Sequence, residues 1–270
     1  MKELSGKIAI VTGASRGIGK QTALKLGASG ATVVVHYRNS KAAAEDVVRQ
    51  IEANGGSGFA VQADFSDPAA PRHFYEVLDP ELQQRFGSNR FDILVNNAGA
   101  GTRAVIEDVS EADLDETLQV DLKSPFFLIK YASARIRDGG RIVNVSSMGT
   151  RVAYPEMAAY SPAKAGLEAL TLLLAAHLGP RGITVNVVLP GATATDMNPG
   201  AQDPQRSQQL AQTIALRRVG QPEDIADVIA FLVSDAGRWV TGQRIDASGG
   251  QRIRSCTRSP TALVTPPAAA

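Results

Sequence analysis

The sequence predicts an α/β fold in which one parallel β-sheet is covered by helices on both faces, a doubly wound arrangement. Short runs rich in Val and Ile alternate with longer segments of helical periodicity. These runs lack the polar alternation of half-exposed strands, and uninterrupted apolar strands are typical of parallel sheets that are buried on both sides. Without an internal repeat or a linker, we predict one domain over residues 1–250 and a tail over residues 251–270.

Seven runs are expected to be strands, and six segments between them are expected to be helices. The predicted strands are Lys7–Val11, Thr32–His36, Phe59–Gln62, Phe91–Val95, Arg141–Val145, Ile183–Leu189 and Gln243–Asp246. The predicted helices are Gly17–Ser29, Lys41–Ala53, Pro68–Phe86, Glu111–Arg137, Ala159–Leu178 and Pro222–Val233. The tail has little apolar periodicity and is rich in Arg, Ser, Thr, Pro and Ala, so we predict that it is disordered.

Composition excludes several classes of protein. Of the 270 residues, 44% are hydrophobic and 20% are charged, which suits a globular protein with a sizeable core. A formal net charge of +1 gives no reason to expect nucleic acid or an anionic membrane as a partner. The single cysteine, Cys256, excludes an internal disulfide, and His36, His73 and His177 fit no metal spacing, so they are assigned structural or surface roles. Without a signal region or a membrane-spanning run, we expect a cytoplasmic protein that holds no metal.

The first predicted strand leads into the glycine-rich loop Thr12–Gly19, and a helix follows directly. Three glycines let the backbone turn tightly and approach a pyrophosphate, while the N-terminus of the helix offers N–H groups to the anion. A plain turn is the alternative, but the position after the first strand favours a dinucleotide site. The predicted cofactor contacts in this loop are Gly13, Ser15, Arg16, Gly17, Ile18 and Gly19.

The end of the second predicted strand indicates which dinucleotide binds. A carboxylate there would bind the 2′-hydroxyl of NAD, but the sequence has Tyr37 and Arg38 after His36, and no acid. Arg38 can hold a phosphate with its planar fork, and Arg16 can assist. We therefore predict Tyr37 and Arg38 as cofactor residues and NADP(H) as the preferred cofactor, with NAD(H) possible. The alternative is a pair of merely exposed arginines.

Polar residues follow the third and fourth predicted strands, at the sheet edge where ligands of open α/β sheets bind. Asp64 can accept a hydrogen bond from the adenine amino group. Asn96 and Asn97 serve equally well as turn residues, so that alternative stays open. The predicted cofactor contacts after these two strands are Asp64, Phe65, Asn97, Ala98 and Gly99.

Tyr160 and Lys164 lie four residues apart in a predicted helix, and therefore on one of its faces. Alone, the pair is a weak signal, because a solvated helix face can show it as well. A phenol that gives a proton to a carbonyl oxygen has an ordinary pKa of about 10, and a nearby ammonium group lowers that pKa. Ser147, after the fifth predicted strand, can hydrogen-bond the substrate oxygen, and Ser146 is a competing candidate.

Six motifs in this order resemble the short-chain dehydrogenase/reductase family from Lys7 to Gly250. They are Thr12–Gly19, Asn96–Gly99, Val145–Ser147, Tyr160 with Lys164, Pro190–Gly191 and Val240–Gly250. The resemblance implies a Rossmann fold with a seven-stranded parallel sheet in the order 3-2-1-4-5-6-7. It also implies nicotinamide-dependent redox chemistry on a carbonyl/alcohol pair, and a homotetramer or homodimer. It favours Ser147 over Ser146 by the separation from Tyr160, and it implies that Lys164 also binds the nicotinamide ribose.

The resemblance further assigns the turn after the sixth predicted strand to the nicotinamide. It implies that the backbone of Thr193 meets the carboxamide and that Thr195 lies near the phosphate. The segment Asp196–Leu216 corresponds to the family's mobile substrate lid, and its polar composition indicates no substrate class. The implied contacts in the turn are Pro190, Gly191, Thr193 and Thr195.

Asp121 departs from the family pattern, which often has an asparagine at this position. That asparagine holds a water that links the lysine to solvent in a proton relay. An ionised Asp121 can accept a hydrogen bond but cannot donate one. Beside Lys164 it would favour the ammonium and weaken the effect of that cation on Tyr160. We therefore add Asp121 to the predicted catalytic residues Ser147, Tyr160 and Lys164 and expect an altered pH profile.

The sequence thus predicts an NADP(H)-preferring oxidoreductase that interconverts a ketone or keto-ester and a secondary alcohol, with Tyr160 as proton donor and acceptor. The expected partner is a small carbonyl or alcohol substrate, with no nucleic acid and no membrane. Two alternatives stay open. One is a nucleotide-binding regulator that has lost catalysis, motivated by Asp121, and the other is an NAD-dependent dehydrogenase.

Overall fold

The computed structural model describes residues 2–101 and 103–251, which form a seven-stranded parallel sheet. The strand order is β3-β2-β1-β4-β5-β6-β7, as predicted, and every pairing is parallel. The predictions for residues 252–270, Cys256 included, lie outside the described residues. The strands are β1 (Ile8–Val11), β2 (Thr32–Tyr37), β3 (Ser57–Gln62), β4 (Phe91–Asn96), β5 (Ile136–Val145), β6 (Thr184–Pro190) and β7 (Arg244–Ala247).

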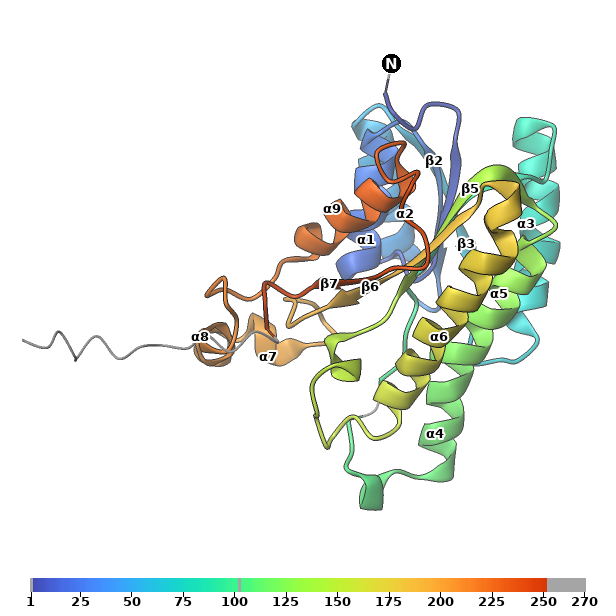
Figure 1. Ribbon diagram of the computed structural model, residues 1–270. Helices are drawn as coiled ribbons and strands as arrows, with labels where there is room; N and C mark the ends of the chain where they lie inside the picture. Colours follow the sequence, from blue (N-terminus) through green and yellow to red (C-terminus); the bar gives the residue numbers. More distant parts are fainter. Residues whose placement is uncertain (1, 102, 252–270) are drawn as a thin grey trace, which may run out of the picture.

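Helices cover both faces of the sheet (Figure 1). One face carries α1 (Gly17–Ala28), α2 (Lys41–Ala53) and α9 (Pro222–Val233), and the other carries α3 (Ala70–Phe86), α5 (Ser124–Ala132) and α6 (Tyr160–Leu178). Three further helices are α4 (Glu111–Leu118), at the lower end in Figure 1, and α7 (Pro199–Gln202) and α8 (Pro204–Gln212), at the left of the same view.

The two faces of the sheet contribute to separate cores. Along β1, Ile8 and Ile10 belong to the cluster on the α3 side, whereas Ala9 and Val11 belong to the cluster on the α1 side. Side chains alternate across a strand, so an uninterrupted apolar run fills both cores at once. This is why the apolar runs in the sequence predicted all seven strands, although β5 begins at Ile136, five residues before its predicted start, and β3 begins at Ser57, two residues before its predicted start.

One predicted helix is wrong. The structure divides Glu111–Arg137 into α4, a π-helical turn at Gln119–Lys123, and α5, which ends at Ala132. Pro125 lacks a backbone N–H, so it fits the first turn of the new helix. Arg137 belongs instead to β5, because Ile136 already pairs with Phe91 across the sheet. The other five predicted helices agree with the structure to within two residues at each end.

No helix among the described residues is long and apolar enough to cross a membrane. Within the same residues, no group of three or more His, Cys, Asp and Glu side chains could hold a metal ion. The cytoplasmic location expected from the sequence stays a prediction.

Candidate active site

A cavity of about 500 Å³ opens beside the carboxyl ends of the central strands. Its walls come from the loops that follow β1 to β6 and from the N-terminal turn of α6. The structure thus brings together residues that are far apart in the sequence. The predicted site residues that line the cavity are Gly13, Ser15, Arg16, Gly17, Ile18, Arg38, Asp64, Phe65, Asn97, Ala98, Gly99, Ser147, Tyr160, Lys164, Pro190, Gly191, Thr193 and Thr195.

Two predicted cofactor residues, Tyr37 and Gly19, are not among the lining residues. The strand β2 continues one residue beyond its predicted end at His36, so the Tyr37 side chain joins the core on the α1 side and is buried. Gly19 is buried in the first turn of α1, where a Cβ atom would collide with the carbonyl oxygen of Gly13. Gly19 is therefore needed for close packing of the loop, and Tyr37 for the core.

The glycine loop has the backbone conformation and the spacing that a bound phosphate requires. Gly13 and Gly17 have φ angles of +62° and +54°, which favour glycine over other residues. A Cβ at Gly13 would lie 2.9 Å from the Cα of Ala98. The first turn of α1 has no side-chain cap and no acidic residue, so its N–H groups and dipole are available to an anion. This part of the chain therefore fits a dinucleotide pyrophosphate.

His36, at the end of β2, holds the glycine loop in place, which is a structural role, one of the two kinds of role expected for it. Its Nδ1 accepts a hydrogen bond from the backbone N–H of Gly13 at 2.9 Å, and its Nε2 lies 3.0 Å from the carbonyl oxygen of Ala63, to which it donates. The ring stacks on Phe65. Complete burial lowers the pKa of His36 to about 4, so the ring is neutral at pH 7.

Asn97 holds the same loop from the side of β4. Its side-chain Nδ2 donates to the carbonyl oxygens of Thr12 and Gly13 at 2.9 and 3.1 Å. The hydroxyl of Thr12 in turn accepts from the backbone N–H groups of Asn97 and Ala98, both at 2.9 Å. Asn97 lines the cavity, but its side-chain amide group is already hydrogen-bonded to the backbone of the loop. This supports the alternative of a structural residue, which the sequence left open.

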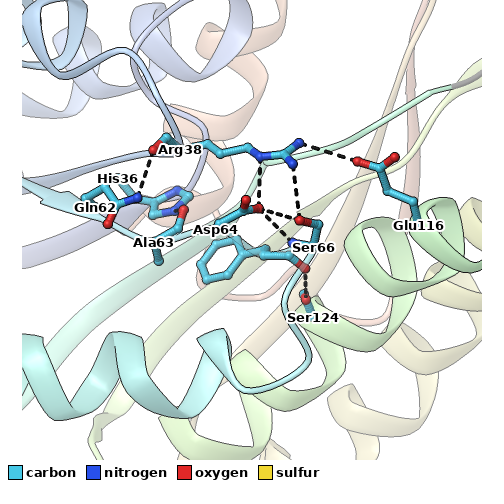
Figure 2. A network of polar contacts seen from close by, with 9 residues as sticks. His36, Arg38, Gln62, Ala63, Asp64, Ser66, Glu116 and Ser124 are labelled. Atoms are coloured by element: carbon cyan, nitrogen blue, oxygen red, sulfur yellow. Dashed lines mark hydrogen bonds and ion pairs between the residues drawn. The ribbon is translucent and has the colours of Figure 1, made fainter.

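At the far end of the cavity, Arg38 lies in a network of polar contacts (Figure 2). Its Nε lies 2.9 Å from Asp64 Oδ1, its Nη2 donates to Ser66 Oγ at 3.2 Å, and its Nη1 donates to Glu116 Oε1 at 3.4 Å. Ser66 and Arg38 hold the pKa of Asp64 below its ordinary value, although burial by itself raises it. Asp64 Oδ1, predicted to accept from adenine, is therefore already engaged by Arg38 and Ser66.

The two serines after β5 have different surroundings. Ser146 Oγ donates to the buried carboxylate of Glu168 at 2.8 Å. Ser147 caps the turn that follows it, accepting a hydrogen bond from the N–H of Gly149 at 3.0 Å. The Ser147 side chain also hydrogen-bonds Tyr160 and lowers the pKa of that phenol. This geometry favours Ser147 as the serine that faces the reaction.

Tyr160 begins α6, and Lys164 lies one turn further along the same helix. The Lys164 Nζ lies 5.6 Å from the centre of the Tyr160 ring and donates to the carbonyl oxygen of Val145 at 3.0 Å. Burial raises the pKa of Tyr160, the Lys164 cation opposes that rise, and Asp121 adds to it.

Asp121 lies behind Lys164, outside the lining of the cavity. Its Oδ1 is 3.0 Å from the Lys164 Nζ, and the side chains are 0% and 3% exposed, so the two form a buried ion pair. Burial lowers the pKa of Lys164, but the Asp121 carboxylate and Tyr160 more than reverse this, and the pKa lies above its ordinary value. The π-helical turn at Gln119–Lys123 holds Asp121 in this position.

Several residues at the outer end of the cavity have no recognisable motif in the sequence. Gln251 donates to the Tyr154 hydroxyl at 3.0 Å and accepts from the N–H of Ala192 at 2.8 Å, so the prediction of a disordered tail is wrong for residue 251. Arg103 and Glu156 form an ion pair at 3.5 Å near the same end. These contacts join segments distant in the sequence, and no local pattern could have indicated them. Apolar lining residues of the cavity include Met148, Met157, Met197 and Leu210.

Comparison with known proteins supports the family resemblance. A family model described as enoyl-(acyl carrier protein) reductase matches residues 13–252. Versicolorin reductase 1 of Aspergillus parasiticus is 40% identical over 259 residues, covering 92% of this chain and 97% of that protein. The 3-oxoacyl-[acyl-carrier-protein] reductase FabG of Staphylococcus aureus is 41% identical over 246 residues, covering 90% and 97% of the two chains.

Among solved structures, the angucycline C-6 ketoreductase LanV with bound NADP superposes with a TM-score of 0.89. It is 44% identical in sequence, and the match covers 92% of this chain and 96% of that one. The family model spans residues 13–19 of the glycine loop and the whole of α6, which carries Tyr160 and Lys164. The chain belongs to the short-chain dehydrogenase/reductase family of NAD(P)-dependent oxidoreductases.

Proposed function

We propose that this protein is an NADP(H)-preferring ketoreductase that converts a ketone or keto-ester into a secondary alcohol. The observation that carries the proposal is the meeting of Ser147, Tyr160 and Lys164 in the cavity that also holds the glycine loop. The names of three relatives support carbonyl reduction, because they are a versicolorin reductase, a 3-oxoacyl reductase and an angucycline ketoreductase that binds NADP.

The cofactor would lie along the cavity, with its pyrophosphate on the glycine loop and its 2′-phosphate on Arg38. Arg16, which also lines the cavity, would be the second cation to assist; it is mostly exposed and pairs with Asp196 at 3.7 Å. The nicotinamide would meet the loop after β6, where the Thr193 hydroxyl donates to the carbonyl oxygen of Gly191 at 3.0 Å. When bound, the reduced cofactor supplies a hydride to the carbonyl carbon.

The protein would supply the proton. The Tyr160 hydroxyl donates it to the carbonyl oxygen as negative charge develops there, and the Ser147 hydroxyl donates a hydrogen bond to the same oxygen. Lys164 stabilises the tyrosinate that remains, because its cation opposes the rise in pKa that burial causes. Asp121 keeps Lys164 charged at the cost of part of that stabilisation.

The apolar part of the cavity lining suits an apolar ketone. Three methionines and Leu210 line the cavity, and methionine side chains adapt to flat or irregular apolar ligands. Tyr154 adds a ring whose hydroxyl is held by Gln251. We therefore propose that a bulky, apolar ketone is accepted in preference to a small polar one, and that keto-esters are accepted when their alkyl part is apolar.

Spectrophotometric measurement of NADPH consumption tests the proposal. The panel contains 1-tetralone, ethyl acetoacetate, a 3-oxoacyl thioester and a 2-enoyl thioester, each with NADPH and with NADH. Tyr160→Phe should lower kcat on the accepted ketone by about 100-fold or more, while calorimetry shows unchanged NADPH binding. Full turnover by Tyr160→Phe would refute the mechanism. NADPH binding without turnover of any substrate would support a non-catalytic regulator instead, and a preference for NADH would refute the role given to Arg38.

We also propose a homodimer or homotetramer. Phe126 on α5 and Leu172 and Leu173 on α6 are large apolar side chains that are 45%, 63% and 68% exposed. They lie on α5 and α6, two of the three helices that cover that face of the sheet (Figure 1). Burial against a second copy would remove this apolar surface from water. Light scattering should give two or four times the mass of one chain, and a monomeric mass would contradict the proposal.

A further inference from the structure

The Glu116 side chain contacts Arg38, a cavity-lining residue that is 78 residues earlier in the chain. Figure 2 shows Glu116 coming from α4, on the side of the guanidinium opposite to the Arg38 backbone. The carboxylate Oε1 lies 3.4 Å from Nη1, and the two side chains are 48% and 47% exposed. Glu116 thus occupies one edge of the cation proposed to bind the 2′-phosphate.

The other contacts of Arg38 are held more firmly than the contact with Glu116. Asp64 Oδ1 accepts from the Ser66 N–H at 3.0 Å and from the Ser66 hydroxyl at 2.7 Å, which fixes the carboxylate that binds Arg38 Nε. The Gln62 side chain donates to the carbonyl oxygen of Arg38 at 3.0 Å and fixes its backbone. Glu116 has the longest of the three side-chain contacts, so it is the group that a ligand can displace.

The charges around Arg38 determine how the displacement of Glu116 affects binding of a 2′-phosphate. Two carboxylates, Asp64 and Glu116, already face the single positive charge of Arg38. A 2′-phosphate brings a further charge of about −1.5 to −2 to the same cation. With Asp64 fixed, the phosphate competes with Glu116 for Nη1 and is repelled by it as long as the carboxylate stays nearby.

We propose that Glu116 is a specificity-determining residue that weakens 2′-phosphate binding by competing for Arg38. The carboxylate holds the guanidinium when no 2′-phosphate is present, and it must move away before the phosphate can bind. Glu116 therefore narrows the difference in affinity between NADPH and NADH that Arg38 alone would create. This inference rests on the proposed use of NADP(H).

Calorimetric titration with adenosine 2′,5′-bisphosphate tests the inference without any turnover, and 5′-AMP serves as the ligand that lacks the 2′-phosphate. The test variant is Glu116→Gln, which keeps the size of the side chain and removes its charge. The matched control is Asp115→Asn, which removes one charge from the adjacent, exposed residue of the same helix. Titrations at low ionic strength keep the electrostatic contribution large.

Glu116→Gln should bind adenosine 2′,5′-bisphosphate about three- to tenfold more tightly than the unaltered protein, as expected for removing one like charge at roughly 6 Å in partly exposed surroundings. Its affinity for 5′-AMP should be unchanged, and the ratio of NADPH to NADH affinity should rise by the same factor. Asp115→Asn should change the affinity for adenosine 2′,5′-bisphosphate less than twofold, roughly.

Unchanged or weaker bisphosphate binding by Glu116→Gln would overturn the inference, because Glu116 would then be neutral or would help to orient Arg38. An equal gain in Asp115→Asn would also overturn it, since the effect would be that of overall charge. Arg38→Ala distinguishes a failure of the proposed cofactor preference from a failure of the role given to Glu116. If it leaves NADPH affinity unchanged, the proposed cofactor preference fails as well. If it weakens NADPH binding while Glu116→Gln has no effect, only the role of Glu116 fails.

Discussion

Replacing Asp121 by asparagine is expected to move the pH profile of the reaction toward lower pH. Asp121 Oδ1 lies 3.0 Å from the Lys164 Nζ, which in turn lies 5.6 Å from the centre of the Tyr160 ring, so this oxygen lies within about 8.6 Å of that ring. All three side chains take part in one buried group of charges. The change to asparagine removes one negative charge and keeps nearly the same shape.

The size of the effect follows from that separation. If the full separation of about 8.6 Å is taken as the distance, with an effective dielectric constant of about 20, a carboxylate disfavours the tyrosinate by about 2 kcal/mol, which is roughly a thirtyfold change in equilibrium. The sign follows from the same repulsion: Asp121 raises the pKa of Tyr160, so its removal lowers that pKa. Ketone reduction needs the protonated phenol, and its decline at alkaline pH should begin at lower pH in Asp121→Asn.

Steady-state rates of ketone reduction and alcohol oxidation, measured across pH, test this expectation. Alcohol oxidation needs the tyrosinate, so its rise with pH should move in the same direction as the decline in reduction. Asparagine can accept a hydrogen bond from Lys164, and the protein should stay folded, which thermal unfolding checks. Profiles that stay in place, or that move to higher pH in the folded variant, would refute the electrostatic role of Asp121.

Two further predictions concern residues that support the site. His36 has a pKa of about 4 in the folded protein against an ordinary 6.5, so the unfolded chain binds the proton first and stability should fall by about 2 kcal/mol as the pH drops from 6.5 to 5. Urea unfolding should show a smaller loss over this range in His36→Gln, and equal losses would contradict the assignment. Glu168 accepts from the Ser146 and Thr150 hydroxyls, on either side of Ser147. Glu168→Ala should lower kcat about tenfold or more while NADPH affinity stays the same, and Glu168→Gln should restore the rate; an unchanged kcat in Glu168→Ala would exclude this positioning role.

The fold could be predicted from the sequence because the evidence for it is local. An apolar run such as Thr32–His36 carries its own strand signal, and the glycine loop carries its own turn signal. Local patterns fail where tertiary packing decides the boundary. Tyr37 extends its strand by one residue and moves from the predicted site into the core, and the continuous helical pattern of Glu111–Arg137 conceals a π-helical turn and the start of β5.

The site, too, contains residues that local patterns predict and residues whose positions depend on tertiary packing. Tyr160 and Lys164 could be predicted because one helix sets their spacing, but the orientation of Ser146 toward Glu168 depends on how α6 packs against β5. Gln251 could not be predicted as part of the site, because both of its partners belong to segments at least 59 residues away in the chain. Apart from Asp121, which the family resemblance placed beside Lys164, the sequence did not indicate the second contacts, those that hold a functional side chain or neutralise its charge.

Glu116 and Asp121 show why these second contacts matter. The two carboxylates are five residues apart, one in α4 and one in the π-helical turn that follows, and each faces a different cation, Arg38 or Lys164. Five residues along a regular helix would point the two side chains in directions well over 90° apart. The segment that runs from α4 into the π-helical turn therefore presents one carboxylate to Arg38 and the other to Lys164. Arg38, after β2, and Lys164, on α6, indicate the kind of chemistry. The segment that carries Glu116 and Asp121 sets how strongly these two cations stabilise a negative charge nearby. For Asp121 this influence was expected from the family resemblance, whereas for Glu116 it could be inferred only from the folded chain, because Glu116 lies 78 residues from Arg38 in the sequence.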